Sequence, residues 1–161
     1  MQLAPIYKNK KVLVTGHTGF KGSWLCEWLL DLGAQVCGYS IDIPTKPSHF
    51  EILGLEKRIM HHQGDVRDLK KLSGIFSEFK PDFVFHLAAQ PLVRVSYDHP
   101  VETFETNVVG TVNVLECIRK TDSVKVAVLV ATDKCYENKE WEFGYRETDR
   151  LGGADPYSAS K

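Results

Sequence analysis

Tyr157 and Lys161 have the types and spacing of a proton-transfer pair. They lie four residues apart in DPYSASK, and Pro156 suits the first position of a helix, so both side chains are expected on one helical face. The positive charge of the lysine would stabilise a tyrosine phenolate and let it take a proton from a substrate hydroxyl. An exposed pair without a role is the alternative for this motif taken alone.

The stretch KVLVTGHTGFKG, from Lys11 to Gly22, has the order of a phosphate-binding loop. An apolar run predicts a strand, three glycines follow, and a helix is predicted up to residue 33. The apolar residues of that helix recur at Phe20, Trp24, Leu25, Trp28, Leu29 and Leu32. Gly16 permits a tight turn, Gly19 lets backbone N–H groups approach a pyrophosphate, and Gly22 lets the helix lie close to the strand. The loop predicts a dinucleotide site with contacts from Gly16, Thr18, Gly19, Phe20 and Gly22.

The elements that must position these residues alternate along the chain. Further strands are predicted over 35–40, 60–63, 83–87 and 124–130, and a loop with at most a short helix over 43–58. Further helices are predicted over 69–79 and 104–118. The apolar face of the last one is expected at Phe104, Val108, Val112, Leu115 and Ile118. Repeated strand–helix–strand units predict one Rossmann-like, doubly wound α/β domain over residues 1–161, with a parallel sheet covered on both faces.

Residues that follow the predicted strands lie at the edge of the sheet where this fold binds its ligands. Asp42 is placed to accept hydrogen bonds from an adenosine ribose, and its charge favours NAD over NADP. Lys21 is a mild signal for the phosphate of NADP, and a loop aspartate in water is the alternative for Asp42. Further cofactor contacts are expected from Asp65 and Val66 to adenine, and from Leu87, Ala88 and Ala89 along the ribose and phosphates. The alternative for Asp65 and Val66 is ordinary turn chemistry, and the alternative for 87–89 is that small residues are usual at a tight strand exit.

Composition favours a cytoplasmic protein of ordinary charge. Twenty basic and 21 acidic residues give a net charge of −1, which argues against binding to nucleic acid or membranes through bulk electrostatics. MQLAPIYKNK lacks the apolar segment of a signal peptide. The four cysteines are scattered without a CxxC pair, so we expect reduced thiols and no metal site.

Five motifs together resemble the extended short-chain dehydrogenase/reductase family, whose members act on nucleotide sugars: TGHTGFKG, GDVRD, HLAAQP, ETNVVGT and YSASK. Within that family, HTGFKGSWL, AAQPLVRVSY, TDKCYENKEW and GGADPYSASK look like the 4,6-dehydratases that act on CDP-glucose. The resemblance covers essentially the whole chain, and the motifs occur in the family's order.

The resemblance implies a redox-neutral lyase reaction on bound NAD that makes CDP-4-keto-6-deoxyglucose, a precursor of sugars in bacterial surface polysaccharides. Tyr157 would take the proton of the sugar's 4-hydroxyl, Lys161 would stabilise the phenolate and contact the nicotinamide ribose, and Thr132 would hydrogen-bond the reacting oxygen. Asp133 would protonate the hydroxyl that leaves C6. Asn107 matches the family's active-site asparagine, with a polar side chain satisfied by backbone as the alternative. Gln90 and Ser96 would face the substrate.

Lys134 departs from the dTDP-glucose dehydratases, which carry Asp-Glu where this chain has Asp133-Lys134. A lysine can remove the C5 proton only in its neutral form, which burial or the charge of Lys161 would have to favour. Otherwise Lys134 would stabilise the enolate, or simply pair with a carboxylate.

The sequence stops inside the helix that Pro156 begins, so we expect an N-terminal portion without the family's substrate domain. The isolated chain should bind NAD weakly and turn over no sugar, and the full-length protein should be a homodimer. Two other functions stay open. A nucleotide-sugar 4-epimerase or reductase would need Thr132, Tyr157 and Lys161 but no groups for elimination. A non-catalytic dinucleotide-binding module would use the fold alone.

Overall fold

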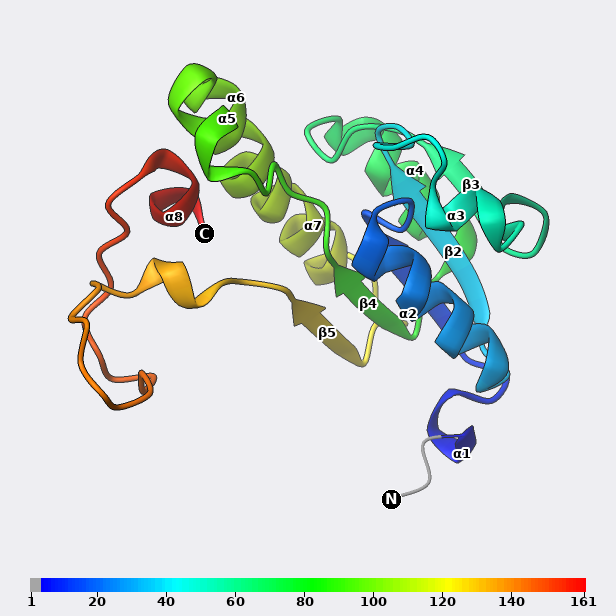
Figure 1. Cartoon of the computed structure of the whole chain (residues 1–161). Coiled ribbons are helices and arrows are strands. Elements are labelled where there is room, and N and C mark those ends of the chain that lie inside the picture. The colour runs from blue at the N-terminus through cyan, green and yellow to red at the C-terminus, as the bar shows by residue number, and fades with distance from the viewer. Residues whose placement is uncertain (1–3) are drawn as a thin grey trace.

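A computed structural model describes residues 4–161 and contains one parallel sheet of five strands (Figure 1). The strand order is β3-β2-β1-β4-β5, and every neighbouring pair is parallel. The strands are β1 (Lys11–Thr15), β2 (Gln35–Ser40), β3 (Met60–Gln63), β4 (Phe83–His86) and β5 (Val126–Leu129). The doubly wound fold predicted from the alternation of strands and helices is confirmed, and β2 and β3 have the predicted bounds. The fifth strand is shorter than predicted.

Helices connect the strands and cover both faces of the sheet. The α-helices are α1 (Ala4–Tyr7), α2 (Phe20–Asp31), α3 (His49–Ile52), α4 (Leu69–Phe79), α5 (Val93–Asp98), α6 (Pro100–Phe104), α7 (Gly110–Arg119) and α8 (Pro156–Ser160). Two 3-10 turns are η1 (Leu55–Lys57) and η3 (Asp133–Cys135), and η2 (Glu105–Val109) is a π-helical segment between α6 and α7.

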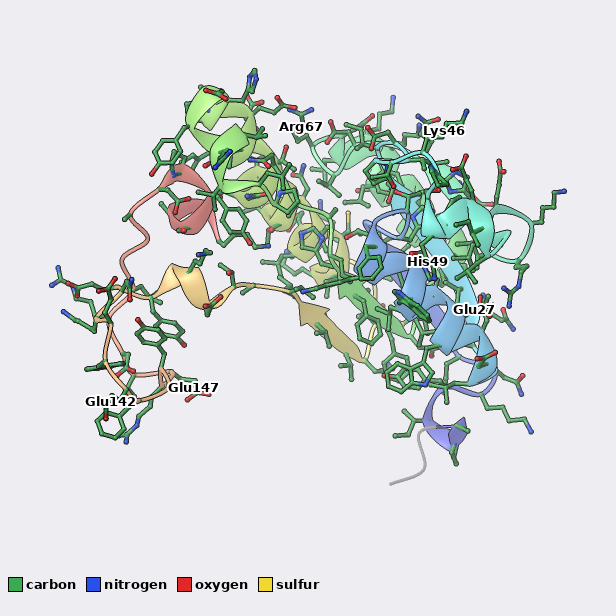
Figure 2. All side chains as sticks on the ribbon, in the orientation of Figure 1. Glu27, Lys46, His49, Arg67, Glu142 and Glu147 are labelled. Carbon is green, nitrogen blue, oxygen red and sulfur yellow. The ribbon has the colours of Figure 1, made fainter. Side chains whose placement is uncertain are left out.

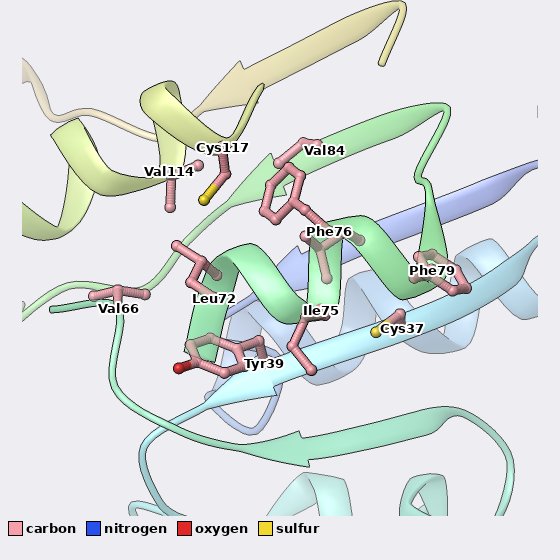
Figure 3. Close-up of a cluster of buried hydrophobic side chains, with 11 residues drawn as sticks. Cys37, Tyr39, Val66, Leu72, Ile75, Phe76, Phe79, Val84, Val114 and Cys117 are labelled. Carbon is pink, nitrogen blue, oxygen red and sulfur yellow. The ribbon is translucent and has the colours of Figure 1, made fainter. Parts of the chain in front are cut away.

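Two apolar clusters hold the helices on the sheet. The cluster on one face joins β2 and β4 to α4 and α7, and Figure 3 shows Phe76 and Leu72 pointing from α4 into it. The cluster on the other face joins β1 and β2 to α2, with Val12, Val14 and Leu29 at its centre. Because both faces of the central strands are buried, the carboxyl edge of the sheet is the part of the sheet left for ligands.

The predicted apolar face of α2 is confirmed only in part. Leu29 is buried as predicted, but Phe20, Trp24 and Trp28 are more than half exposed, and Cys26, which was not predicted, is buried beside Leu29. The helix carries two apolar stripes, and the one with smaller residues packs against β1 because it allows a closer approach. The aromatic stripe faces outward, where Trp24 stacks on His49 with 4.3 Å between ring centroids.

The predicted apolar face of 104–118 is also exposed for the most part. Phe104, Val108, Val112 and Leu115 are exposed, and Val114 and Cys117 are buried instead. Several other buried positions of this stretch carry small or polar residues, among them Thr103, Asn107 and Gly110, and an apolar pattern does not reveal them.

The chain between β5 and α8 forms a long irregular segment, residues 130–155. Beyond the η3 turn it is held by an isolated bridge between Tyr136 and Leu151 and by stacking of Tyr136 on Tyr145. Figure 2 shows Glu142 and Glu147 at its outer end, away from the sheet.

All four cysteines are free thiols. Cys26, Cys37 and Cys117 are buried, whereas Cys135 is half-buried in the η3 turn. Among residues 4–161, no helix is both long enough and apolar enough to span a membrane.

Candidate functional site

A cavity of about 660 Å³ runs along the carboxyl edge of the sheet. Most of the residues predicted to bind the cofactor line it: Gly16, Thr18, Gly19, Phe20, Gly22, Asp42, Asp65, Val66, Leu87, Ala88, Ala89, Tyr157 and Lys161. Gln90, predicted to face the substrate, also lines it. The end of every strand and the start of α8 therefore meet at one concave surface, as the topology requires.

The glycine turn after β1 is fixed by close backbone contacts. Gly16 has φ +72°, and a Cβ there would lie 2.7 Å from the backbone nitrogen of Ala88. A Cβ on Gly22 would overlap the carbonyl oxygen of Gly16. Only glycine fits at these two positions, and the turn and the helix that follows it are locked together.

The first turn of α2 makes this end of the cavity a site for anions. Gly19 is its N-cap and supplies no side-chain acceptor, so the N–H groups at the start of the helix are left for a ligand. They lie beside the cavity with the positive end of the helix dipole. This cradle fits the pyrophosphate of a dinucleotide.

Asp42 lies two residues beyond the end of β2, at the same edge of the sheet. The Thr18 hydroxyl donates to the Asp42 carbonyl oxygen at 2.6 Å, which ties the glycine turn to the end of β2. The Asp42 carboxylate is exposed at the cavity, and Lys21 lines the cavity too. Asp42, which favours NAD, and Lys21, which would tolerate the extra phosphate of NADP, therefore face the same cavity.

Asp65 is held by Arg67, a residue that sequence reasoning missed. The Arg67 guanidinium donates to the Asp65 carboxylate at 2.6 and 2.8 Å, and the Arg67 backbone N–H donates at 2.8 Å. Burial raises the pKa of Asp65, but these hydrogen bonds outweigh burial and leave its pKa below the usual value. Arg67 also lines the cavity. Its position two residues after Asp65 in GDVRD is the feature of the sequence that could have predicted their contact.

Helix α8 presents the proton-transfer pair to the other end of the cavity. Asp155 caps the helix by accepting from the Ser158 backbone N–H at 2.9 Å, and Pro156 occupies the first turn as predicted. Tyr157 and Lys161 both line the cavity. The Lys161 ammonium donates to the Val130 carbonyl oxygen at 2.8 Å, and burial lowers the pKa of Lys161.

The predicted elimination residues do not line that cavity. Asp133 and Lys134 are exposed and line a neighbouring cavity of about 270 Å³, together with Asp155 and Ser158 of α8. Lys134 forms no ion pair within residues 4–161. Thr132 lies in neither cavity lining: its hydroxyl donates to the Asp133 carboxylate at 3.2 Å and accepts from the Lys134 backbone N–H at 3.3 Å. It caps the η3 turn, so a role toward substrate requires it to change partners.

Asn107 and Ser96 also lie outside the cavity lining. The Asn107 carboxamide accepts from the Gln90 backbone N–H at 2.8 Å and donates to the Gln90 carbonyl and to the Ser160 hydroxyl. Ser96 is fully buried and donates to the Val93 carbonyl oxygen within α5. Their polar atoms are satisfied by the protein, which is the alternative that the sequence left open for Asn107.

Two buried histidines lie next in the chain to residues that line the cavity. His17, inside the glycine turn, contacts His61 with 2.7 Å between Nε2 and Nδ1. Burial, and then the nearby His61, lower the pKa of His17 to about 3. His86, at the end of β4, is 2% exposed, and burial followed by the charge of Lys161 lowers its pKa to about 4. The motif HLAAQP contains His86, but its burial could not be read from the sequence.

Comparison with known proteins places the chain among sugar-nucleotide enzymes. Residues 13–161 match the family model described as GDP-mannose 4,6 dehydratase. CDP-glucose 4,6-dehydratase of Salmonella typhimurium is 55% identical over 155 residues, which cover 96% of this chain and 43% of the relative. GDP-mannose 4,6-dehydratase of Vibrio cholerae is 33% identical, over 95% of this chain and 43% of the relative. The chain thus spans less than half the length of these relatives.

Solved structures of related enzymes share the fold. UDP-glucose 4-epimerase of Thermotoga maritima, solved with UDP-glucose, matches with a TM-score of 0.83 and 29% identity over 94% of this chain and 47% of the epimerase. UDP-glucose 4-epimerase of Thermus thermophilus, solved in complex with NAD, matches with a TM-score of 0.78 and 32% identity over the same shares.

Proposed function

The chain belongs to the GDP-mannose 4,6-dehydratase family, and from that membership we propose that it is the NAD-binding part of a nucleotide-sugar 4,6-dehydratase that acts on CDP-glucose. The choice of CDP-glucose as the substrate is supported by the 55% identity to the CDP-glucose enzyme over 96% of this chain, compared with 33% identity to a GDP-mannose enzyme. The glycine turn and the pair of Tyr157 and Lys161 line one cavity, which supports a shared site for cofactor and sugar.

The residues at the glycine end fit NAD. The free N–H groups of α2 would bind its pyrophosphate, and the Asp42 carboxylate would accept hydrogen bonds from the adenosine ribose. Asp65, kept ionised by Arg67, would accept from the adenine amine. The charge of Asp42 repels a 2′-phosphate and favours NAD over NADP. When bound, NAD accepts hydride from C4 of the sugar and supplies it again at C6.

At the other end, Tyr157 would take the proton of the sugar's 4-hydroxyl while C4 is oxidised. The nearby Lys161 ammonium would stabilise the phenolate that this transfer requires. Thr132 would hydrogen-bond the reacting oxygen after releasing its cap on the η3 turn.

Asp133 and Lys134 would carry out the elimination. The 4-ketone makes the C5 proton acidic, Lys134 would remove that proton or stabilise the enolate, and Asp133 would protonate the C6 hydroxyl so that it leaves as water. Both residues are exposed on the η3 turn, which begins one residue beyond Thr132. Their cavity shares α8 with the cofactor cavity, which supports a sugar bound where the two meet.

A nucleotide-sugar 4-epimerase is the second candidate, favoured by the solved neighbours, which are UDP-glucose 4-epimerases. An epimerase needs the proton-transfer pair and no elimination residues, so the presence of Asp133 and Lys134 favours the dehydratase. A binding module without catalysis would have no use for Tyr157 beside the cofactor.

We also propose a cytoplasmic homodimer. An exposed apolar stripe runs from α6 through η2 to α7 and includes Phe104, Val108, Val112 and Leu115, a surface suited to a second copy. The free thiols suit a reducing compartment.

The test is to incubate the protein, expressed in full, with CDP-glucose and NAD and to record the ultraviolet band of a 4-keto sugar in base. A Tyr157→Phe variant is the matched control, because it keeps the ring and removes the hydroxyl; it should bind NAD but form product at least about 1,000-fold more slowly. Formation of an epimer without 4-keto sugar would favour the second candidate. NAD binding without any product would favour a dinucleotide-binding module that has no catalytic activity.

A further inference from the structure

His86 does not itself line the cavity, although Leu87, which follows it in the chain, does. It ends β4, the strand between β1 and β5, and its imidazole is buried at 2% exposure. A buried imidazole needs a hydrogen-bond partner for each ring nitrogen, because an unpaired buried polar atom costs free energy. His86 has both partners, one on each side.

The first partner belongs to the glycine turn. The Thr15 hydroxyl oxygen lies 2.7 Å from His86 Nδ1 and accepts from the Ala88 backbone N–H at 3.2 Å. The single hydrogen of the Thr15 hydroxyl is then free to point at Nδ1. Thr15 immediately precedes Gly16, so this bond holds the strand end from which the cofactor cradle begins.

The second partner belongs to the helix beyond the π-helical segment. The Thr111 hydroxyl lies 3.0 Å from His86 Nε2 and donates its single hydrogen to the Asn107 carbonyl oxygen at 2.6 Å. Nε2 must therefore carry the imidazole hydrogen and donate to Thr111. The two contacts select one neutral tautomer, with the hydrogen on Nε2.

From Thr111 the contacts continue to the helix of the proton-transfer pair. Asn107 donates to the Ser160 hydroxyl at 2.8 Å, and Ser160 donates to the Tyr157 carbonyl oxygen at 2.7 Å. A second route leaves the backbone of His86, whose carbonyl accepts from the Val130 N–H at 3.0 Å. The Val130 carbonyl in turn accepts from the Lys161 ammonium at 2.8 Å. His86 is thus joined to α8 through a side-chain route and a backbone route.

We propose that His86 is a positioning residue: its neutral imidazole, hydrogen-bonded between Thr15 and Thr111, fixes the distance between the glycine turn and the helix that carries Tyr157. This inference rests on the proposed function, because that distance sets where the sugar's C4 stands relative to the cofactor. A protonated imidazole would present a hydrogen to Thr15 as well, and the Thr15 hydroxyl would lose its acceptor.

The two hydrogen bonds of the His86 imidazole, the Thr15 arm and the Thr111 arm, are tested separately with Thr→Val substitutions. These keep the shape of the side chain and remove its hydroxyl. Thr111→Val cuts the arm toward α8, so kcat should fall about tenfold while the KM for CDP-glucose and the Kd for NAD stay within about twofold. Thr15→Val cuts the arm toward the glycine turn, so the Kd for NAD should rise about tenfold.

Thr121→Val is the matched control. Thr121 donates to the carbonyl oxygen of Cys117, four residues earlier, as Thr111 does to Asn107, but it has no histidine partner. This variant should lose less thermal stability than Thr111→Val, because it leaves no buried imidazole nitrogen unpaired, and it should keep kcat and Kd. Equal kinetic losses in Thr111→Val and Thr121→Val, or none in either, would overturn the proposal.

Nitrogen-15 NMR of the protein labelled at histidine gives a readout that does not depend on turnover. At pH 7 His86 should show the tautomer with hydrogen on Nε2. A hydrogen on Nδ1, or an imidazolium ion, would overturn the proposal. Failure of the unaltered protein to form 4-keto sugar would instead refute the proposed function, and the tautomer and the Kd for NAD would still decide the role of His86.

Discussion

The two ends of the site are built in different ways. At the glycine end, backbone contacts and buried side chains fix the turn: Val12, Val14 and His17 have no exposed surface, and Gly16 touches Ala88. At the elimination end, Asp133 and Lys134 are exposed on a 3-10 turn. The segment that follows contains Phe143, which is 76% exposed.

This difference indicates which part of the site is ready before ligands arrive. The cofactor end is held by the same contacts that hold the sheet, so it should open only when the domain unfolds. The segment of residues 130–155 has few buried apolar contacts, and it should open at a much lower free energy. We therefore expect substitutions that weaken cofactor binding to lower the free energy of unfolding of the domain as well. Substitutions of the exposed elimination residues should change the reaction rate and leave that free energy unchanged.

The largest effect should come from adding one methyl group at the glycine end. Gly22→Ala places a Cβ against the Gly16 carbonyl oxygen, so the free energy of unfolding should fall by about 3 kcal/mol or more and NAD binding should be lost. Gly74→Ala in α4 is the control, because no atom lies within 4 Å of its added Cβ. It should gain about 0.5 to 1 kcal/mol from helix propensity. Urea unfolding measures both, and equal stability of the two variants would contradict the close packing.

The next effect should appear at the elimination end without a change in stability. Lys134→Ala should lower the rate of 4-keto sugar formation at least about 100-fold and leave the melting temperature and the Kd for NAD unchanged, because the side chain is exposed. Lys139→Ala is the control on the same segment; it breaks only a surface ion pair with Glu137. Full activity of Lys134→Ala would remove Lys134 from the elimination.

A smaller effect should follow from lowering the pH, and it should originate at the cofactor end. In the folded chain the pKa of His17 is about 3 and that of His86 about 4, against the ordinary value of 6.5. Below that ordinary value the unfolded chain binds protons that the folded chain does not, so the free energy of unfolding falls as the pH falls. From pH 7 to pH 6 the loss should be about 1 kcal/mol for the two together. Urea unfolding at both pH values would measure it, and a constant stability would show that the histidines are not held neutral.

The sequence predicted the framework well because strands and turns leave local signals. The ranges of β2 and β3 and the start of α8 at Pro156 follow from apolar runs and from proline, which act over a few residues. The gathering of Asp42, Ala88 and Tyr157 at one cavity follows from the topology of a parallel sheet.

The parts that could not be predicted depend on distant contacts. Trp24 and Leu29 are both apolar residues of α2, and only the sheet decides which one is buried. The Asn107 carboxamide contacts the backbone of Gln90, which lies 17 residues away in the chain. Arg67 and His86 acquire their roles from partners that the sequence does not place beside them.

The uneven burial of the thiols means that the protein comes with one convenient labelling position. Burial raises the pKa of Cys26 and Cys37 to about 12, and Cys117 is buried as well, so these three should resist maleimides, which react with thiolates. Cys135 follows Lys134 directly and is the most accessible of the four. A fluorophore attached there would stand beside the elimination residues and would report the arrival of a sugar as a change in its emission.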